Sequence, residues 1–245
     1  MADGLKRFYE SVSVRKEGKS FAILLDAREL RTPAGNPLKL PSRALAEAVA
    51  REWATQQDRI RPDRMPLTRL VNTAVERTAA MPLEVIDKLA AYGETDLLCH
   101  WAEYPDELIL RQRTDWQPLL DWAEQSLGVR LEPVAGIRPH PQAPESLDTL
   151  RRHLTALDPI SLTAAETAAS VTGSVILALA LAFGRLTASD AWRISRIDED
   201  YQIEKWGEDA EAQRLAEGRR AALDVAATVF TALHPEPGTG TRTDS

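Results

Sequence analysis

The sequence contains little cysteine and little histidine. Cys99 is the single cysteine among 245 residues, so it cannot form a disulfide within the chain or contribute to a thiolate cluster for zinc. The four histidines never stand four residues apart, the spacing that places two imidazoles on one face of a helix. These absences predict a reducing compartment, no metal site and no cofactor.

Positive charge and long apolar runs are also scarce. The chain carries 30 Lys and Arg against 37 Asp and Glu, for a formal net charge of -7. Binding of nucleic acid or of a membrane surface requires clustered cationic side chains, so we expect neither partner. The longest apolar run, residues 170–184, is shorter than the about 20 residues of a membrane span and predicts a buried central helix. The amino terminus, MADGLKRFYE, has neither a signal-peptide nor a transit-peptide pattern, which predicts a cytoplasmic protein.

The hydrophobic pattern predicts an α+β fold. Short β-like segments alternate with turn residues over the first forty positions, as is typical of an antiparallel meander. Helical spacing begins after Ser42, a predicted N-cap. Two further strand-like pieces, residues 96–101 and 129–134, flank a helix expected over residues 106–126. Beyond them the pattern is helical throughout.

A proline-rich segment predicts the domain boundary. GIRPHPQAP, Gly136 to Pro144, holds three prolines and a glycine and therefore excludes regular structure. We expect a mixed α+β domain with an antiparallel β-rich start over residues 1–138 and an all-α, orthogonal-type helical bundle over residues 144–233. A disordered tail is expected over residues 234–245.

Helix caps can be proposed within the predicted bundle. Thr163 with Glu166 and Thr187 with Asp190 both fit a capping side chain followed by an acid in the first turn. A helix beginning near Ala188 is expected to end at Gly207, and Asp209 to cap the next one.

Motifs that would indicate catalysis are incomplete. GKS at residues 18–20 lacks the upstream glycine and the helix start that a phosphate loop needs. Neighbouring Cys99 and His100 would point to opposite faces of a strand. The pair Gly173-Ser174 lacks the other glycines of a nucleophile elbow, and small residues suit close helix packing. We therefore expect no catalytic residue.

The stretch DEDYQIEKWGEDAEAQR, Asp198 to Arg214, combines seven carboxylates with a tyrosine and a tryptophan. The residues alone leave two interpretations open: a face that docks another protein, or an ordinary solvated helix surface. Trp206 lies among acids and is expected to be half-exposed, whereas most other tryptophans are expected in the core. Trp53, on one helical stripe with Leu45 and Val49, is the example.

Seven segments in order resemble one family, the assembly chaperones for the α subunit of the F-type ATP synthase, which comprise the mitochondrial α-subunit assembly factors and their bacterial relatives. The resemblance runs from about Lys6 to Leu233. The segments are KRFY (6–9), LDARELRTP (25–33), EWATQQDRIRPDRMPLTRLVNTAVER (52–77), YGETDLLC (92–99), RQRTDWQPLLDW (111–122), TGSVILALA (172–180) and DEDYQIEKWGEDAEA (198–212).

The chain departs from the family pattern at two places. Ala27 replaces the glycine that usually follows the aspartate, which suggests that this turn has no positive φ here. His100-Trp101 replaces the more usual Tyr-Arg, which argues against a polar role for these positions.

The resemblance implies a chaperone that is not an enzyme, binds the unassembled α subunit and prevents its aggregation until the β subunit pairs with it. It is expected to be monomeric when free, and bacterial relatives are cytoplasmic. The acidic stretch would then be the client-binding face, through Asp198, Tyr201, Glu204, Trp206, Glu208, Asp209 and Glu211. The alternative is a carboxylate-based hydrolase or lyase in which Asp96, Asp198 and Glu199 converge in a cleft between the domains.

Overall fold

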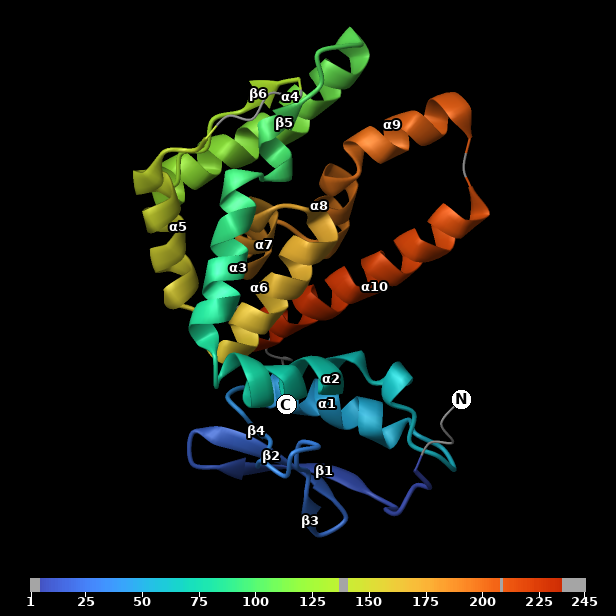
Figure 1. Ribbon diagram of the computed structural model, residues 1–245. Coiled ribbons are helices and arrows are strands. Elements are labelled where there is room, and N and C mark those ends of the chain that lie inside the picture. Colours follow the sequence, from blue (N-terminus) through green and yellow to red (C-terminus); the bar gives the residue numbers. More distant parts are fainter. Residues whose placement is uncertain (1–4, 137–140, 208, 235–245) are drawn as a thin grey trace, which may run out of the picture.

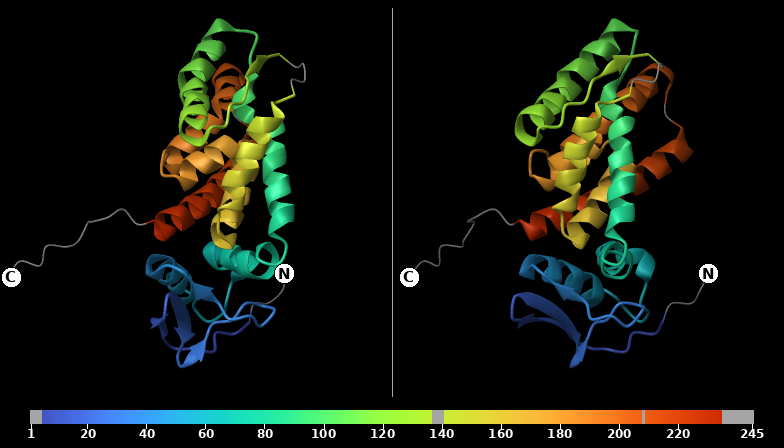
Figure 2. Two further views of the ribbon diagram at one scale, coloured as in Figure 1. Left: turned by 90° about the vertical axis from the view of Figure 1, so that its left-hand side faces the viewer. Right: turned by 60° about the vertical axis from the view of Figure 1, so that its left-hand side comes forward.

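The computed structural model describes residues 5–136, 141–207 and 209–234. A small sheet lies at one end of the molecule, helices α1 and α2 form a layer against it, and the remaining helices build a larger body beyond that layer (Figures 1 and 2). We call the first part the sheet lobe and the second the helical body. This arrangement confirms the predicted α+β class, with an antiparallel sheet near the amino terminus followed by helices.

Four strands form the sheet: β1 (Val12–Glu17), β2 (Ser20–Leu25), β3 (Arg28–Glu29) and β4 (Lys39–Leu40). β1 and β2 make an antiparallel hairpin, with Val12 opposite Leu25. β3 and β4 both pair with β2, and an antiparallel bridge between Arg31 and Pro37 also joins the two segments of the last expected hairpin. Asp26, rather than its neighbour Ala27, takes the positive φ of 54° in the turn after β2.

Helix α1 (Arg43–Ala54) covers the sheet, and Ser42 caps it as predicted by accepting from the Leu45 amide. After the short helix η1 (Pro62–Arg64) come α2 (Pro66–Thr73) and a π-helical turn, η2 (Ala74–Thr78). The Glu52 carboxylate on α1 accepts from the Leu67 and Thr68 amides, which satisfies the free donors at the start of α2. This contact fixes α2 beside α1.

The helical body follows in chain order. Its elements are α3 (Pro82–Glu94), η3 (Leu97–Cys99), β5 (His100–Trp101), α4 (Asp106–Trp122), the π-helical turn η4 (Ala123–Leu127), β6 (Val134–Ala135), α5 (Pro144–Thr155), α6 (Pro159–Thr172), α7 (Val175–Ala182), α8 (Ala188–Ser195), α9 (Ile197–Trp206) and α10 (Ala210–Leu233). Of the two predicted strands here, only the two-residue parallel pair β5–β6 forms, and Cys99 is buried in η3.

The sequence predicted one helix over the apolar run 170–184, but the structure has two, α6 and α7. α6 ends at Gly173, whose φ of 72° belongs to the left-handed region, and Ser174 begins α7 by accepting from the Leu177 amide. Gly173 and Ser174 are therefore a C-cap and an N-cap, not a small pair inside a helix. Both helices are almost wholly buried, so the run is central, but the helix breaks near the start of the run.

Of the other predicted helix ends, the structure confirms some and contradicts others. The capping box of Thr187 and Asp190 at α8, the end of α9 at Gly207 and the cap of α10 by Asp209 are confirmed. Thr163 is not a cap: it lies inside α6, which Asp158 caps. The helix expected from Ala188 to Gly207 is divided at Arg196 into α8 and α9.

Helices on the two sides of the proline-rich segment pack together: α3, which precedes the segment, contacts α5 and α6, which follow it. The boundary placed at 138–144 stays a prediction, and so does the disordered tail, of which residues 235–245 lie outside the described part of the chain. None of the described helices has the length and apolar character needed to cross a membrane.

Candidate functional site

Figure 1 shows that most of the acidic stretch lies on α9 and the start of α10, at the outer end of the helical body. We call residues 196–207 and 209–220 the α9–α10 limb. Trp206, with 78% of its surface exposed, is more exposed than expected, and Asp209 and Glu211 are also open to solvent. Glu208, another predicted client-binding residue, lies outside the described residues.

Ion pairs fasten α9 to α4 at this end of the body. Both oxygens of Glu204 accept hydrogen bonds from the Arg111 guanidinium, at 2.8 Å each. Arg111 also donates to Glu107 at 2.8 Å, and Glu107 accepts from Lys205 at 3.1 Å. The hydrogen bond from Arg111 lowers the pKa of Glu204, so this acid stays ionised at neutral pH. Glu204 is thus exposed, but both of its carboxylate oxygens already bind Arg111.

Tyr201, which the sequence placed among the client-binding residues, is only 8% exposed. Its ring faces the body, where the Arg111 guanidinium carbon lies 5.4 Å and the Lys205 ammonium 4.9 Å from the ring centre. Cations at these distances are attracted to the ring face. Tyr201 therefore helps to hold α9 against α4 through its contact with Arg111.

Asp198, which the sequence placed on the client-binding face, is half-buried and faces inward. It accepts from the Gln112 side-chain amide at 2.7 Å, and the Gln112 oxygen accepts from the Ala102 amide at 2.8 Å. Burial raises the pKa of Asp198, opposed by the hydrogen bond from Gln112. The contact joins the start of α9 to α4 and to the loop before α4.

Asp96 is fully buried beneath the start of α7. Its oxygens accept from the Leu98 amide at 3.0 Å and the Ile176 amide at 3.2 Å, so it caps η3 and satisfies a free donor in the first turn of α7. Burial raises its pKa to about 6. A carboxylate enclosed in this way meets no substrate. Among the described residues, no group of three or more His, Cys, Asp or Glu is arranged to hold a metal ion.

An open hollow of about 440 Å³ lies between α8 and α9 on one side and α10 on the other. Trp192, Ile203 and Ala216 supply its apolar lining, and the charged lining residues are Arg196, Asp200, Glu204, Glu217 and Arg220. Sequence reasoning missed this hollow because its walls come from three helices. The only signal was the helical spacing of Arg196, Asp200 and Ile203 on one side of α9.

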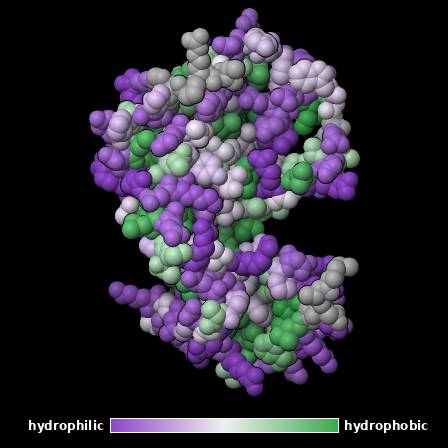
Figure 3. All heavy atoms as spheres, viewed as in Figure 1, coloured by the Kyte–Doolittle hydropathy of each residue, from purple (hydrophilic) through white to green (hydrophobic). Residues whose placement is uncertain are grey.

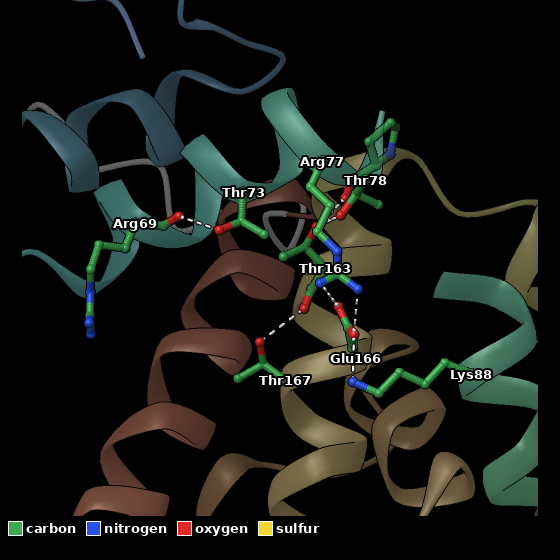
Figure 4. Close-up of polar contacts among 9 residues, drawn as sticks. Arg69, Thr73, Arg77, Thr78, Lys88, Thr163, Glu166 and Thr167 are labelled. Carbon is green, nitrogen blue, oxygen red and sulfur yellow. Dashed lines mark hydrogen bonds and ion pairs between the residues drawn. The ribbon is translucent and has the colours of Figure 1, made fainter. Parts of the chain in front are cut away.

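A polar cluster joins the sheet lobe to the helical body (Figure 4). Arg77 on η2 and Lys88 on α3 point toward Glu166, which lies in the middle of α6. Lys88 donates to Glu166 at 2.8 Å, and the Thr78 and Thr163 hydroxyls lie 2.8 Å apart beside it. The sequence had assigned Glu166 to a helix start. Its place in an otherwise small and apolar helix was the feature that marked it for another role.

The outer surface is hollowed where the two parts meet. Figure 3 shows a notch between the sheet lobe and the helical body on the side of α10, with hydrophobic and polar residues mixed along both edges. α10 reaches the lobe at its carboxyl end, where the Ser42 hydroxyl donates to the Ala232 carbonyl. The first turns of α10 extend away from this contact toward the α9–α10 corner.

Comparisons with known proteins agree with this architecture. The model of the ATP12 chaperone protein family matches residues 6–124. The mitochondrial protein atp12 of Schizosaccharomyces pombe is 28% identical over 222 residues, covering 86% of this chain and 76% of that protein.

Two solved structures share nearly the whole fold. The crystal structure of Atp12 from Paracoccus denitrificans is 43% identical with a TM-score of 0.89, covering 93% of this chain and 98% of that chain. A protein from Agrobacterium tumefaciens is 42% identical with a TM-score of 0.87, covering 93% and 86%. The chain therefore belongs to the ATP12 chaperone family, the family of ATP synthase assembly chaperones that its sequence motifs resemble.

Proposed function

We propose that this protein binds the unassembled α subunit of the F-type ATP synthase and keeps it from aggregating until it pairs with the β subunit. The free chaperone acts as a monomer in the bacterial cytoplasm. Membership in the ATP12 chaperone family supports the general role, and the α9–α10 limb supports a client-binding surface at this place.

The exposed Trp206 is the observation that carries the proposal. Tryptophan is enriched where proteins bind one another, because it combines a large apolar area with few rotatable bonds. With 78% of its surface exposed, Trp206 leaves most of its ring open to a partner, and the exposed acids Asp209 and Glu211 follow it in the sequence. These three residues and Glu208 form the contact surface, while Asp198, Tyr201 and Glu204 hold α9 in place for it.

The physical basis of the proposed activity is that the chaperone covers the exposed apolar interface of the unassembled α subunit. A subunit that is meant to lie in an oligomer exposes an apolar interface until its partner arrives, and such a surface aggregates. A binding partner lowers the concentration of the free form by mass action, without consuming ATP. The acids orient the encounter and the tryptophan slows dissociation.

The test is to dilute denatured α subunit into buffer with and without the chaperone and to follow light scattering. We expect suppression by the parent, weaker suppression by Trp206→Ala and Glu211→Gln, and melting temperatures close to that of the parent. Arg113→Ala, an exposed change on α4 outside the limb, is the matched control. Equal protection by parent and limb variants would contradict the assignment of the surface, and no protection by the parent would contradict the function.

A further inference from the structure

The first turns of α10 lack the packing that holds the rest of the helix. From Leu223 onward, buried positions recur every three or four residues at Ala226, Val229 and Phe230. Residues 210–221 are all exposed except Ala216, which is half-buried. A helix exposed on all sides is normally stabilised by ion pairs or by a partner.

Ion pairs do not supply that support. No ion pair among the described residues includes Glu211, Arg214, Glu217 or Arg220. Arg214 donates to the carbonyl of Ala210 on its own helix, and Arg219 donates to the Val171 carbonyl at 2.5 Å. The segment therefore presents an unpartnered face along the hollow between α9 and α10.

Apolar residues on both walls contribute to the lining of the hollow. Trp192 and Ile203 lie on one side and Ala216 on the other. Trp206 lies outside the lining but stands three residues after Ile203, a spacing that places both residues on one side of α9. The half-buried residues and the exposed tryptophan together form one apolar row along α8 and α9.

Charges around this row are balanced within the chain. Arg196 lies 5.1 Å from the Trp192 ring and is paired with Asp200 at 3.1 Å. Glu204 is held by Arg111, as described above. The remaining rim charges, Glu217 and Arg220, have opposite signs and lie one turn apart on α10. Such a rim complements an uncharged apolar surface better than a strongly basic or acidic one.

The walls also restrict the backbone of the occupant. All of them are helices, whose backbone donors and acceptors bond within the helix, so an extended strand would find no edge to pair with. A helix satisfies its own backbone and can lay one apolar stripe into a groove.

We infer that the hollow between α9 and α10 receives the uncharged apolar face of one amphipathic helix of the client. The inference rests on the proposed function and adds the chemistry of the bound segment. Acids at the corner act on association, whereas burial of an apolar stripe in the hollow acts on dissociation. The two contributions can therefore be separated kinetically.

The experiment measures association and dissociation of the α subunit by surface plasmon resonance. Ala216→Phe fills the hollow, and Ala221→Phe places the same side chain on an exposed position of the same helix outside the lining. We expect about tenfold faster dissociation for Ala216→Phe, a factor that corresponds to about 1.4 kcal/mol, and parent behaviour for Ala221→Phe. Raising the salt concentration should slow association of the parent but leave its dissociation rate nearly unchanged.

The outcomes are distinguishable. Equal dissociation rates for the two folded phenylalanine variants would overturn the hollow while leaving the proposed function intact. If Ala216→Phe melts well below the parent, Ile203→Ser is measured instead, because it removes apolar lining without adding volume, and a parent-like dissociation rate for it overturns the inference equally. A parent that fails to bind the α subunit overturns the proposed function and this inference with it.

Discussion

Arg111 on α4 and Glu204 on α9 are joined by two parallel hydrogen bonds of 2.8 Å, although 93 residues separate them in the sequence. Such two-point pairs fix direction as well as distance, because the planar guanidinium matches the carboxylate. Glu204 lies in the last turn of α9, two residues before Trp206, so the pair holds the end of the helix that carries Trp206 against α4. Glu204, which the sequence placed on the docking face, instead holds α9 against α4 through Arg111.

Replacing Arg111 should loosen α9 without unfolding the protein. Arg111→Ala removes both hydrogen bonds to Glu204, and we expect faster amide hydrogen exchange over α9 with little change in melting temperature, because the pair is exposed and screened by water. Arg111→Lys should restore only part of the protection, since a point charge cannot make the two-point contact. Exchange in α9 that matches the Arg113→Ala control would show that the pair does not hold the helix.

Glu166 should stabilise the junction between the sheet lobe and the helical body. Glu166→Gln keeps one acceptor for Lys88 but removes the charge that Arg77 and Lys88 share, and we expect a loss of about 1–2 kcal/mol in the free energy of unfolding. The loss is moderate because both cations are half-exposed and regain water. Thr163→Val, which breaks the neighbouring bond to Thr78, is the comparison, with an expected loss of about 1 kcal/mol.

Urea unfolding of both single variants and the double variant checks this. Because Arg77 and Thr78 both lie on η2 and both contact α6, the two single losses should not simply add, and the double variant measures the coupling between them. A Glu166→Gln variant as stable as the parent would show that the cluster is a solvated contact.

Much of the sheet lobe could be predicted from the sequence, because its strands are separated by turn residues and α1 begins at a capping serine. The α6–α7 break could not, since Gly173 and Ser174 stand in a run that is apolar on both sides. The small size of Gly173 suited helix packing as well as a left-handed cap, and only the backbone angle distinguishes them.

The position of the acidic stretch at an exposed corner was predictable, but the separate roles of its residues were not. Asp198 and Glu204 cannot be told from Asp209 and Glu211 in the sequence. In the structure, however, Gln112 binds Asp198 and Arg111 binds Glu204. Those partners come from α4, and contacts across so many residues leave no local spacing to read. The hollow was missed for the same reason.

Trp53 should tolerate substitution less well than Trp206, although it is not the fully enclosed core residue that the sequence predicted. It is half-buried, its ring lies 5.9 Å from that of Tyr9, and its carbonyl accepts from the Tyr9 hydroxyl at 2.7 Å. Trp53→Arg removes the ring packing but lets the guanidinium reach water, so we expect a loss of about 2–4 kcal/mol. Trp206→Arg is the control and should leave the melting temperature unchanged; equal melting of the two variants would contradict the prediction.

Asp96 should make a contribution to stability that decreases as the pH rises. An aspartate in the unfolded chain titrates near about 3.9, and burial raises the folded-state pKa of Asp96 to about 6. Between these values the folded state holds more protons than the unfolded state, so the slope of the unfolding free energy with pH is negative for this group. Its stabilising effect is complete at low pH, is lost between about pH 4 and pH 6, and changes little above that.

The comparison with Asp96→Asn isolates this contribution from acids of opposite sign. Glu204, Glu107 and Asp26 have lowered pKa values, so they add stability as the pH rises and partly mask Asp96 in the parent. Asparagine stays neutral, so the parent should lose about 2 kcal/mol relative to the variant from pH 4 to pH 7, because at pH 4 an aspartate in the unfolded chain is already about half ionised. Urea unfolding of both proteins across this range measures the difference, and a difference that does not vary with pH would show that Asp96 titrates as it does in the unfolded chain.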